Sequence, residues 1–461
     1  MSLTFEELSR SCVGTDAVVP FFGGERRYVN LDNAATTPAL RQVQETIDRF
    51  LPWYSSIHRG TGYKSRLSTE VFERCRATVA DFVGATANET VIFGKNTTEM
   101  VNKLSRRLGL SQADVVCLSD AEHHSNDLPW RKVAQVVRLP VDRRGAMDLD
   151  ALETELRRGR VRVVAATAAS NVTGHLSPIH EIAALAHRHG ALCFADCAQL
   201  AAHRRVDMRP PEDPGHLDLL AFSAHKMYAP YGVGALVGPR RLFDEGEPDH
   251  VGGGMVEVVT PTRAYWSQSP DRDEPGTPNL LGAIALARAI RCLLEAGFDA
   301  IAEHEQRLTR YALARLAKLP GITLYGDAGW VSGEDRVGVI PFNLAGVGHS
   351  LLSAAISWEG AIGVRHGCFC AHPFIQRLLE LSAADSSRMI DQVLAHDRRE
   401  IPGLVRMSFG LYNDERDVDA LALTLERFAR EGLSGRYRFD AVLGEYEPEG
   451  FRPAIDPSLG I

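Results

Sequence analysis

The central part of the chain alternates short apolar runs with amphipathic stretches, and this rhythm restricts the fold more than any other feature. Seven runs are expected to form strands: 90–94, 115–119, 136–139, 161–167, 191–196, 217–222 and 234–237. The stretches between them, such as the one that places Ile179 and Ile182 at helical spacing, are expected to form helices. Apolar strands that alternate with helices indicate a mostly parallel sheet covered on both faces. Because the connection after Phe222 is short for a crossover, we expect the last strand to run antiparallel.

The rhythm changes after residue 245, which predicts more than one domain. Residues 245–280 are rich in Gly, Pro and charge and are expected to form functional loops. From about residue 320 onward, short strands separated by helices are typical of a smaller α+β unit. We expect an N-terminal arm (1–30), a large ligand-binding domain (31–295), a small C-terminal domain (296–436) against which the N-terminal segment can pack, and a C-terminal extension (437–461).

Bulk composition argues against several classes of partner. Net charge is −8 over 461 residues, and no basic stretch is interleaved with aromatic residues, so we expect no nucleic-acid partner. No apolar run approaches the roughly 20 residues of a membrane span, and the first residues lack the pattern of an export signal. The eight cysteines are scattered through apolar stretches, which favours buried thiols over a disulfide framework or a zinc site. We therefore expect a cytoplasmic protein with no membrane partner and no bound metal.

A lysine and an aspartate occur at or just after the ends of two predicted strands. Lys226 follows the strand that ends at Phe222, and Asp196 ends the strand before it. Because the carboxyl ends of parallel strands meet at one edge of a sheet, both side chains are expected at that edge. Pyridoxal phosphate needs this pair: the lysine forms a Schiff base, and the carboxylate keeps the pyridine nitrogen protonated. On spacing alone, a surface lysine and a helix-capping aspartate explain the pattern equally well.

Four further polar residues follow predicted strands on the same edge. Thr98 stands at a helix start, where a hydroxyl and free N–H groups can bind a phosphate. His123 can stack on an aromatic cofactor or transfer protons near neutral pH. The Asn171 amide can reach a ring oxygen or a substrate carboxylate, and the Gln199 amide has the same possible partners. Alone, each has a plain interpretation as a helix cap, an exposed helix start or a turn residue; their shared edge favours a cofactor site.

The motifs that contain these residues follow one another in a familiar order. They are the segments 31–38, 58–60, 97–99, 122–126, 170–171, 195–199, 222–226, 276–279, 364–365 and 406–409. On these motifs the chain resembles the class V aminotransferase family of fold type I pyridoxal phosphate enzymes, and within it most closely the cysteine desulfurase and selenocysteine lyase group. The resemblance implies an α/β fold: a large domain with a mostly parallel seven-stranded sheet between helices, followed by a small α+β C-terminal domain.

The resemblance also implies which residues hold the cofactor. Lys226 would carry the Schiff base and later move the Cα proton, and Asp196 would pair with the pyridinium nitrogen. Gln199 would hydrogen-bond the ring hydroxyl, and His123 would stack on the ring. The implied phosphate-binding residues are Thr97, Thr98, Ser223 and His225, with Thr277 supplied by a second subunit. That last contact implies a homodimer with active sites shared between the subunits.

For the substrate, the resemblance implies an amino acid whose carboxylate is bound by Asn171 and Arg406, with Arg365 nearby. A guanidinium offers a bidentate fork that matches a carboxylate. Cys370 falls at the place of the group's nucleophilic cysteine, whose thiolate attacks the sulfur of cysteine and leaves alanine and a protein persulfide. A sulfur-acceptor protein would then receive that sulfur. Arg365 or His366 could lower the pKa of the thiol.

Several alternatives stay open at this point. Cys370 could be a small buried hydrophobe, and Cys368, which departs from the group's pattern, could point the same way or merely pack. The stretch 371–405 and the tail after residue 436 exceed the group's usual length, which suggests a divergent member with a larger sulfur-containing substrate. The alternatives to a cysteine desulfurase are a C–S lyase acting by β-elimination, a class V aminotransferase or epimerase, and a catalytically silent binding protein.

Overall fold

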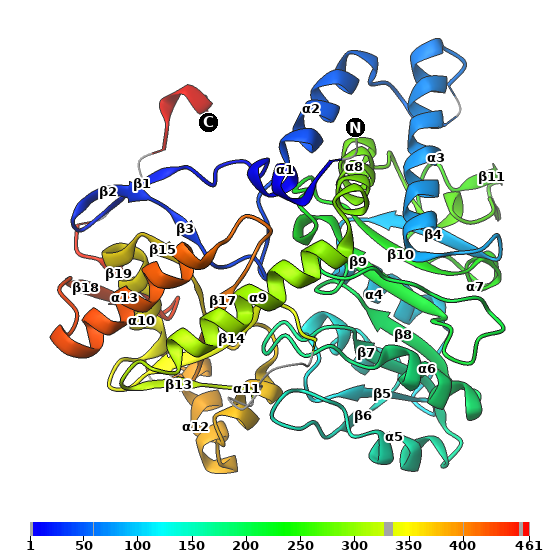
Figure 1. The fold of residues 1–461 in the computed structure, drawn as a ribbon. Helices are drawn as coiled ribbons and strands as arrows, with labels where there is room; N and C mark the ends of the chain where they lie inside the picture. Colours follow the sequence, from blue (N-terminus) through cyan, green and yellow to red (C-terminus); the bar gives the residue numbers. More distant parts are fainter. Residues whose placement is uncertain (1–2, 59, 327–334, 400, 451–454, 461) are drawn as a thin grey trace.

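The computed structural model describes residues 3–58, 60–326, 335–399, 401–450 and 455–460. Figure 1 shows a large α/β body around a wide sheet and a smaller unit at the left of the view. Arg59, which belongs to one of the motifs above, lies outside the described residues. Among the residues described, no helix combines the length and the apolar character that crossing a membrane requires.

The large unit is built on a seven-stranded sheet with the order β4-β10-β9-β8-β7-β5-β6. Its strands are β4 (Glu89–Gly94), β5 (Val115–Ser119), β6 (Gln135–Leu139), β7 (Val161–Thr167), β8 (Leu192–Asp196), β9 (Leu219–Ser223) and β10 (Gly234–Pro239). All seven strands expected from the sequence are present. β10 pairs antiparallel with both β4 and β9, and the other strands pair in parallel, so the prediction for the last strand is confirmed.

Helices cover both faces of this sheet because successive strand residues are apolar on both sides. The covering helices include α3 (Tyr63–Val83), α6 (Ile179–Arg188) and α8 (Leu280–Ala296) on one face and α4 (Thr97–Arg107) on the other. In β5, Val115 and Cys117 belong to the core that contains the first group of helices. Val116 and Leu118 belong to the core that contains α4. Every residue of β5 is buried, as expected for a strand between two layers of helices.

The smaller unit is an antiparallel four-stranded sheet, ordered β13-β14-β17-β16, with helices packed on it. Its elements are β13 (Ile322–Leu324), β14 (Val339–Leu344), β16 (Arg365–Gly367), β17 (Leu404–Ser408), α9 (Phe298–Leu316), α10 (His349–Gly360) and α13 (Glu415–Glu431). Beside this sheet, β15 (Ile362–Gly363) pairs in parallel with β3 (Val29–Asn30). Val29 and Asn30 of the N-terminal segment therefore pack with this unit, whereas Leu8 and Cys12 belong to the core of the large one.

The two stretches that exceed the usual length of the resembled group meet each other on the surface. They fold as α11 (His372–Leu378), α12 (Ala383–Leu394) and a hairpin of β18 (Tyr437–Asp440) and β19 (Glu445–Pro448). The Ser350 hydroxyl of α10 donates to the Gly444 carbonyl at 2.8 Å, which fixes the hairpin on that helix. The Arg398 N–H donates to the Ala441 carbonyl at 3.2 Å and joins the insertion to the tail. The β18–β19 hairpin of the tail thus lies on α10.

The loop-rich stretch 245–280 contains one short hairpin, β11 (Val256–Val259) with β12 (Ala264–Trp266). Val258 and Val259 of this hairpin are exposed. The remaining helices and strands are α1 (Phe5–Arg10), β1 (Val18–Phe21), β2 (Gly24–Arg27), α2 (Arg41–Phe50), α5 (Leu149–Leu156) and α7 (Arg240–Asp244). Most of residues 245–280 is irregular, as the sequence predicted, and the segment exposes apolar side chains at the protein surface.

Candidate active site

A cavity of about 890 Å³, including its open mouth, lies at the carboxyl edge of the large sheet. All sequence-predicted site residues except Thr277 line it: Thr97, Thr98, His123, Asn171, Asp196, Gln199, Ser223, His225, Lys226, Arg365, Cys370 and Arg406. Thr277 lies against a separate cavity of the same subunit. The sheet edge therefore gathers side chains that are up to several hundred residues apart in the chain.

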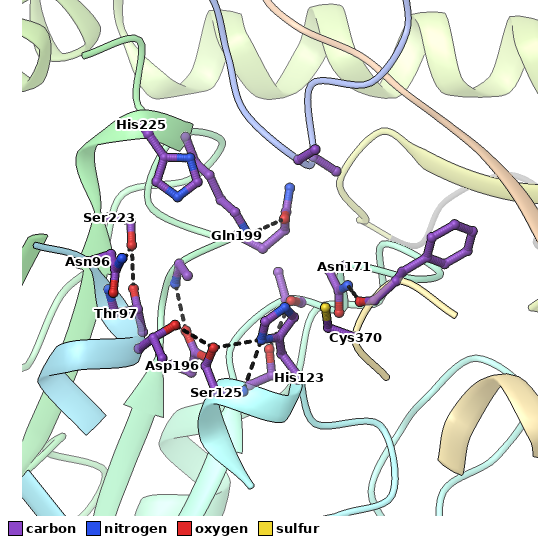
Figure 2. Close-up of a pocket in the computed structure, with 18 of the residues that line it drawn as sticks. Asn96, Thr97, His123, Ser125, Asn171, Asp196, Gln199, Ser223, His225 and Cys370 are labelled. Atoms are coloured by element: carbon purple, nitrogen blue, oxygen red, sulfur yellow. Dashed lines mark hydrogen bonds between the residues drawn. The ribbon is translucent and has the colours of Figure 1, made fainter. Parts of the chain in front are cut away.

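Two groups of side chains mark opposite sides of the cavity in Figure 2. Thr97 and Ser223 mark what we call the α4 end, because α4 begins there. Asn171 and Cys370 mark what we call the thiol end. The first group comes from the large sheet and its helix, whereas the second brings a loop next to the small sheet against a loop of the large unit.

The α4 end joins the end of β9 to the start of α4. The Thr97 N–H donates to the Ser223 hydroxyl oxygen at 2.8 Å, and the two hydroxyls lie 2.8 Å apart. The helix is capped by the Asn96 side chain, which accepts from the Glu99 N–H at 3.0 Å, and not by a threonine hydroxyl. A helix start carries partial positive charge and N–H donors, so this end of the cavity suits an anion such as a phosphate.

Lys226 and Asp196 line the same cavity. Asp196 is the last residue of β8, and Lys226 ends a single 3₁₀ turn after β9. The Lys226 Nζ donates to Gln199 Oε1 at 3.3 Å, and Asp196 Oδ1 accepts from the Ala198 N–H at 3.0 Å. Burial lowers the pKa of Lys226 to about 8, although the charge of Asp196 acts in the opposite direction. Burial raises the pKa of Asp196, whereas the Ala198 N–H and the charge of Lys226 act in the opposite direction.

His123 is a neutral ring held in one orientation. Its Nδ1 accepts from the Ser125 N–H at 3.1 Å, which assigns the ring proton to Nε2. The Ser125 hydroxyl lies 3.0 Å from the same Nδ1 and 2.6 Å from the Thr98 hydroxyl. Burial and the charge of Lys226 lower the pKa of His123 to about 3, and the same two causes lower the pKa of His225 to about 4. Both rings are therefore uncharged at neutral pH.

Two arginines and one aspartate form a charged cluster at the cavity. The buried Arg406 donates through Nη1 to the Asn171 carbonyl at 2.9 Å and through Nη2 to Asp32 Oδ1 at 3.1 Å. Arg365 Nη1 lies 3.8 Å from the other oxygen of Asp32. The Nε of Arg406 is buried and has no hydrogen-bond partner among the described residues. One carboxylate between two guanidiniums leaves net positive charge, which suits one further carboxylate.

The two neighbouring cysteines differ sharply. Cys370 is exposed and lines the cavity, so the alternative that it is a buried hydrophobe is wrong. Cys368 is partly buried, with its sulfur 3.6 Å from the Pro402 carbonyl oxygen, and burial raises the pKa of its thiol to about 11. Burial also lowers the pKa of His366 to about 4, so this histidine is neutral and supplies no charge to a thiolate. Arg365 lines the same cavity as Cys370, and the cations whose charge interacts with Cys370 are Lys226 and Arg406.

Some lining residues carried no role in the sequence analysis. They are Ala34, Ala35, Asn96, Ser125, Thr167, Ala169, Ala198 and Phe369. Asp32 also had no role, although it lies in the motif 31–38 and meets both arginines. An acidic residue in a motif rich in small residues was the available signal for Asp32. Phe369 had no such signal, because its position depends on contacts with the other unit.

Comparison with known proteins shows which family this chain resembles in sequence. The sequence model of the family Aminotransferase class-V matches residues 29–421. A probable cysteine desulfurase from Halalkalibacterium halodurans is 34% identical over 408 residues, which cover 87% of this chain and 92% of that protein. A probable cysteine desulfurase from Halobacterium salinarum is 35% identical over 413 residues, covering 88% and 92%.

Solved structures agree with the sequence comparisons. The apo structure of cysteine desulfurase from Thermococcus onnurineus NA1 has a TM-score of 0.79 and 29% identity, covering 92% of this chain and 98% of that one. The cysteine desulfurase CsdA from Escherichia coli, in an S-sulfonic acid form, has a TM-score of 0.73 and 31% identity, covering 88% and 95%. The predicted α/β architecture is thus confirmed as that of fold type I enzymes, and the chain belongs to the class V aminotransferase family.

Proposed function

We propose that this protein is a pyridoxal phosphate-dependent cysteine desulfurase with Lys226 as the Schiff-base lysine and Cys370 as the sulfur-accepting nucleophile. The observation that carries the proposal is the presence of both side chains in one cavity, together with Arg365 and Arg406. Relatives and structural neighbours named as cysteine desulfurases across most of the chain support it.

The residues present fit the cofactor. The α4 end offers N–H and hydroxyl donors for a phosphate, and the neutral His225 adds a further ring nitrogen. The buried Asp196 would pair with a protonated pyridine nitrogen, whose positive charge would offset the effect of burial on this carboxylate. The depressed pKa of Lys226 increases the share of neutral amine, the form that reacts with a carbonyl. When bound, pyridoxal phosphate supplies a carbonyl that captures the substrate amine and a ring that withdraws electrons from Cα.

The protein's own groups would orient the substrate. Arg406 would bind the carboxylate of cysteine through its guanidinium, with Arg365 adding charge at the mouth. Lys226, once free as an amine, would remove the Cα proton of the substrate. His123 would cover one side of the ring as a neutral plane. These groups would hold the substrate with its side chain toward the thiol end.

Sulfur transfer would then fall to Cys370. Its thiolate attacks the substrate sulfur, a sulfur–sulfur bond forms, and the substrate carbon–sulfur bond breaks. The electron pair of the broken bond stays with the substrate Cβ, which takes a proton and becomes the methyl group of alanine. The enzyme is left as a Cys370 persulfide, which an external thiol reduces to sulfide or a sulfur-acceptor protein receives. Because Cys370 is exposed, an acceptor thiol can reach it.

A homodimer is part of the proposal, because one predicted phosphate contact is missing from the cavity of a single subunit. Thr277 lies against a different cavity, and the nearby hairpin β11–β12 exposes Val258 and Val259. A second subunit seated there would cover these side chains and receive Thr277 at its phosphate. Mixing inactive Lys226→Ala and Thr277→Ala subunits tests this arrangement: hybrid dimers should regain activity, whereas a monomeric enzyme would not.

We also propose that the protein works in the cytoplasm, where thiols stay reduced. All eight cysteines are free, and the proposed reaction needs a reduced Cys370. The natural sulfur acceptor and any substrate larger than cysteine would share the same reaction at Cys370.

The experiment is an assay of cofactor-loaded protein with cysteine and a reducing thiol, measuring alanine, pyruvate and sulfide separately. Equal amounts of alanine and sulfide, abolished in both Lys226→Ala and Cys370→Ala, would support the proposal. Pyruvate with sulfide, undiminished in Cys370→Ala, would identify a β-eliminating lyase. Turnover of an amino donor with a 2-oxo acid, without sulfide, would identify an aminotransferase.

A further inference from the structure

Cys370 stands on a turn whose backbone is unfavourable for its residues. The Ala371 N–H donates to the Cys368 carbonyl at 2.8 Å, which closes a four-residue turn. Its two central residues, Phe369 and Cys370, have φ angles of 49° and 56°. This left-handed region favours glycine, and a bulky residue adopts it only where surrounding contacts impose it. The turn therefore depends on contacts with other segments to keep its shape.

Two hydrogen bonds from the large unit hold both carbonyl groups of the turn. The Asn171 side-chain nitrogen donates to the Phe369 carbonyl at 2.8 Å, and Figure 2 shows this amide beside Cys370. The His124 N–H donates to the Cys370 carbonyl at 2.7 Å. In addition, the guanidinium carbon of Arg406 lies 4.8 Å from the centre of the Phe369 ring. The peptide groups on either side of the thiol are thus bound by distant parts of the chain.

A stacked pair of histidines reinforces the second of these bonds. The rings of His124 and His372 have centres 4.8 Å apart and planes within 8° of each other. His124 Nε2 lies 3.0 Å from His372 Nδ1 and also accepts from the His372 N–H at 3.4 Å. Because Nε2 accepts from that N–H, we assign the His124 proton to its Nδ1 and a proton to Nδ1 of His372. His124 therefore binds the chain on both sides of Ala371.

We propose that His124 and His372 form a clasp that keeps the Phe369–Cys370 turn in its left-handed shape and its thiol in the cavity. This inference rests on the proposed function, since it assigns the clasp to the nucleophile of that reaction. Neither histidine is among the described residues that line the cavity, so both act through the backbone. His372 is in this sense a positioning residue, and it lies at the start of the insertion that follows Cys370.

The test compares His372→Ala with His372→Asn in cofactor-loaded protein, because the asparagine amide nitrogen can take the place of the imidazole Nδ1. A matched control is Arg377→Ala on the same helix, whose ion pair with Asp120 spans 3.9 Å. We expect His372→Ala to lower kcat for sulfide release about tenfold or more, as misplacement of a reacting group does. The KM for cysteine should change by less than about twofold, because the carboxylate site is untouched. His372→Asn should recover most of the lost kcat.

A second readout follows the thiol directly, as the rate at which iodoacetamide alkylates Cys370 at fixed pH, measured by peptide mass spectrometry. A released turn should change this rate in His372→Ala and not in His372→Asn or Arg377→Ala. The clasp is refuted if His372→Ala matches Arg377→Ala in both readouts, or if the asparagine variant is as impaired as the alanine variant. Full sulfide release by Cys370→Ala would instead refute the proposed function, while the alkylation comparison would still report on the turn.

Discussion

The two ends of the cavity are built by different kinds of contact. At the α4 end, Thr97 and Ser223 meet because β4 and β9 lie in one sheet, on either side of β10, and end at the same edge. At the thiol end, Cys370 is brought to the cavity by a turn that needs Asn171 and His124 of the other unit. The proposed cofactor region therefore follows from the topology of one sheet, whereas the position of the proposed reacting thiol depends on how the two units pack.

The largest effect is expected from replacing the two neighbouring cysteines. Cys370→Ser should abolish sulfide release and leave cofactor binding intact, because the Lys226 and α4 regions of the cavity are unchanged. Cys368→Ser is the matched control, since its side chain packs near Pro402 and does not line the cavity among the described residues. Activity in that variant should stay within about twofold of the original protein. Sulfide assays with both variants, alongside the absorbance of bound cofactor, check this, and equal losses would show that the two thiols act as a unit.

A smaller effect is expected from the α4 end. Ser223→Ala removes a hydroxyl that would donate to the phosphate in the proposed site, and a hydrogen bond to a charged group contributes about 1.5–3 kcal/mol. The affinity for pyridoxal phosphate should therefore fall about tenfold or more, while kcat at saturating cofactor changes little. Ser105→Ala is a suitable control, because this buried hydroxyl of the same helix bonds only the Asn102 carbonyl among the described residues. Fluorescence titration of cofactor-free protein measures both affinities, and an unchanged affinity in Ser223→Ala would remove Ser223 from the phosphate site.

The smallest effect concerns pH. Burial lowers the pKa of Lys226 to about 8, so the charged amine predominates below that pH and the neutral, reactive amine above it. The rate at which cofactor-free protein takes up pyridoxal phosphate should rise as pH increases through about 8 and then level off. His123, with a pKa of about 3, should add no step between neutral pH and that rise. Stopped-flow absorbance at a series of pH values measures the profile, and a midpoint near the ordinary lysine value would contradict the buried environment.

The same contrast explains what the sequence could predict. The strands ending at Asp196 and Ser223 carry apolar runs long enough to recognise, and parallel strands share an edge, so those residues could be placed together from the pattern alone. The antiparallel β10 was also predictable, because the connection before it is too short for a crossover.

The thiol end could not be derived in the same way. No local pattern shows that Phe369 and Cys370 adopt a left-handed turn, because the contacts that impose it come from residues some 200 positions away. The neutral state of His366 could not be predicted from the sequence either, because its burial arises from packing in the folded chain. Resemblance pointed to Cys370, whereas the physical reason for its position required the folded chain.

The central claim is that Cys370 receives the substrate sulfur. Cofactor-loaded protein incubated with cysteine in the absence of a reducing thiol, then digested and analysed by mass spectrometry, tests it most directly. The account predicts one added sulfur atom on the peptide that contains Cys370, alanine in equal amount, and no addition on Cys368. Release of pyruvate and sulfide with an unmodified Cys370 would contradict it.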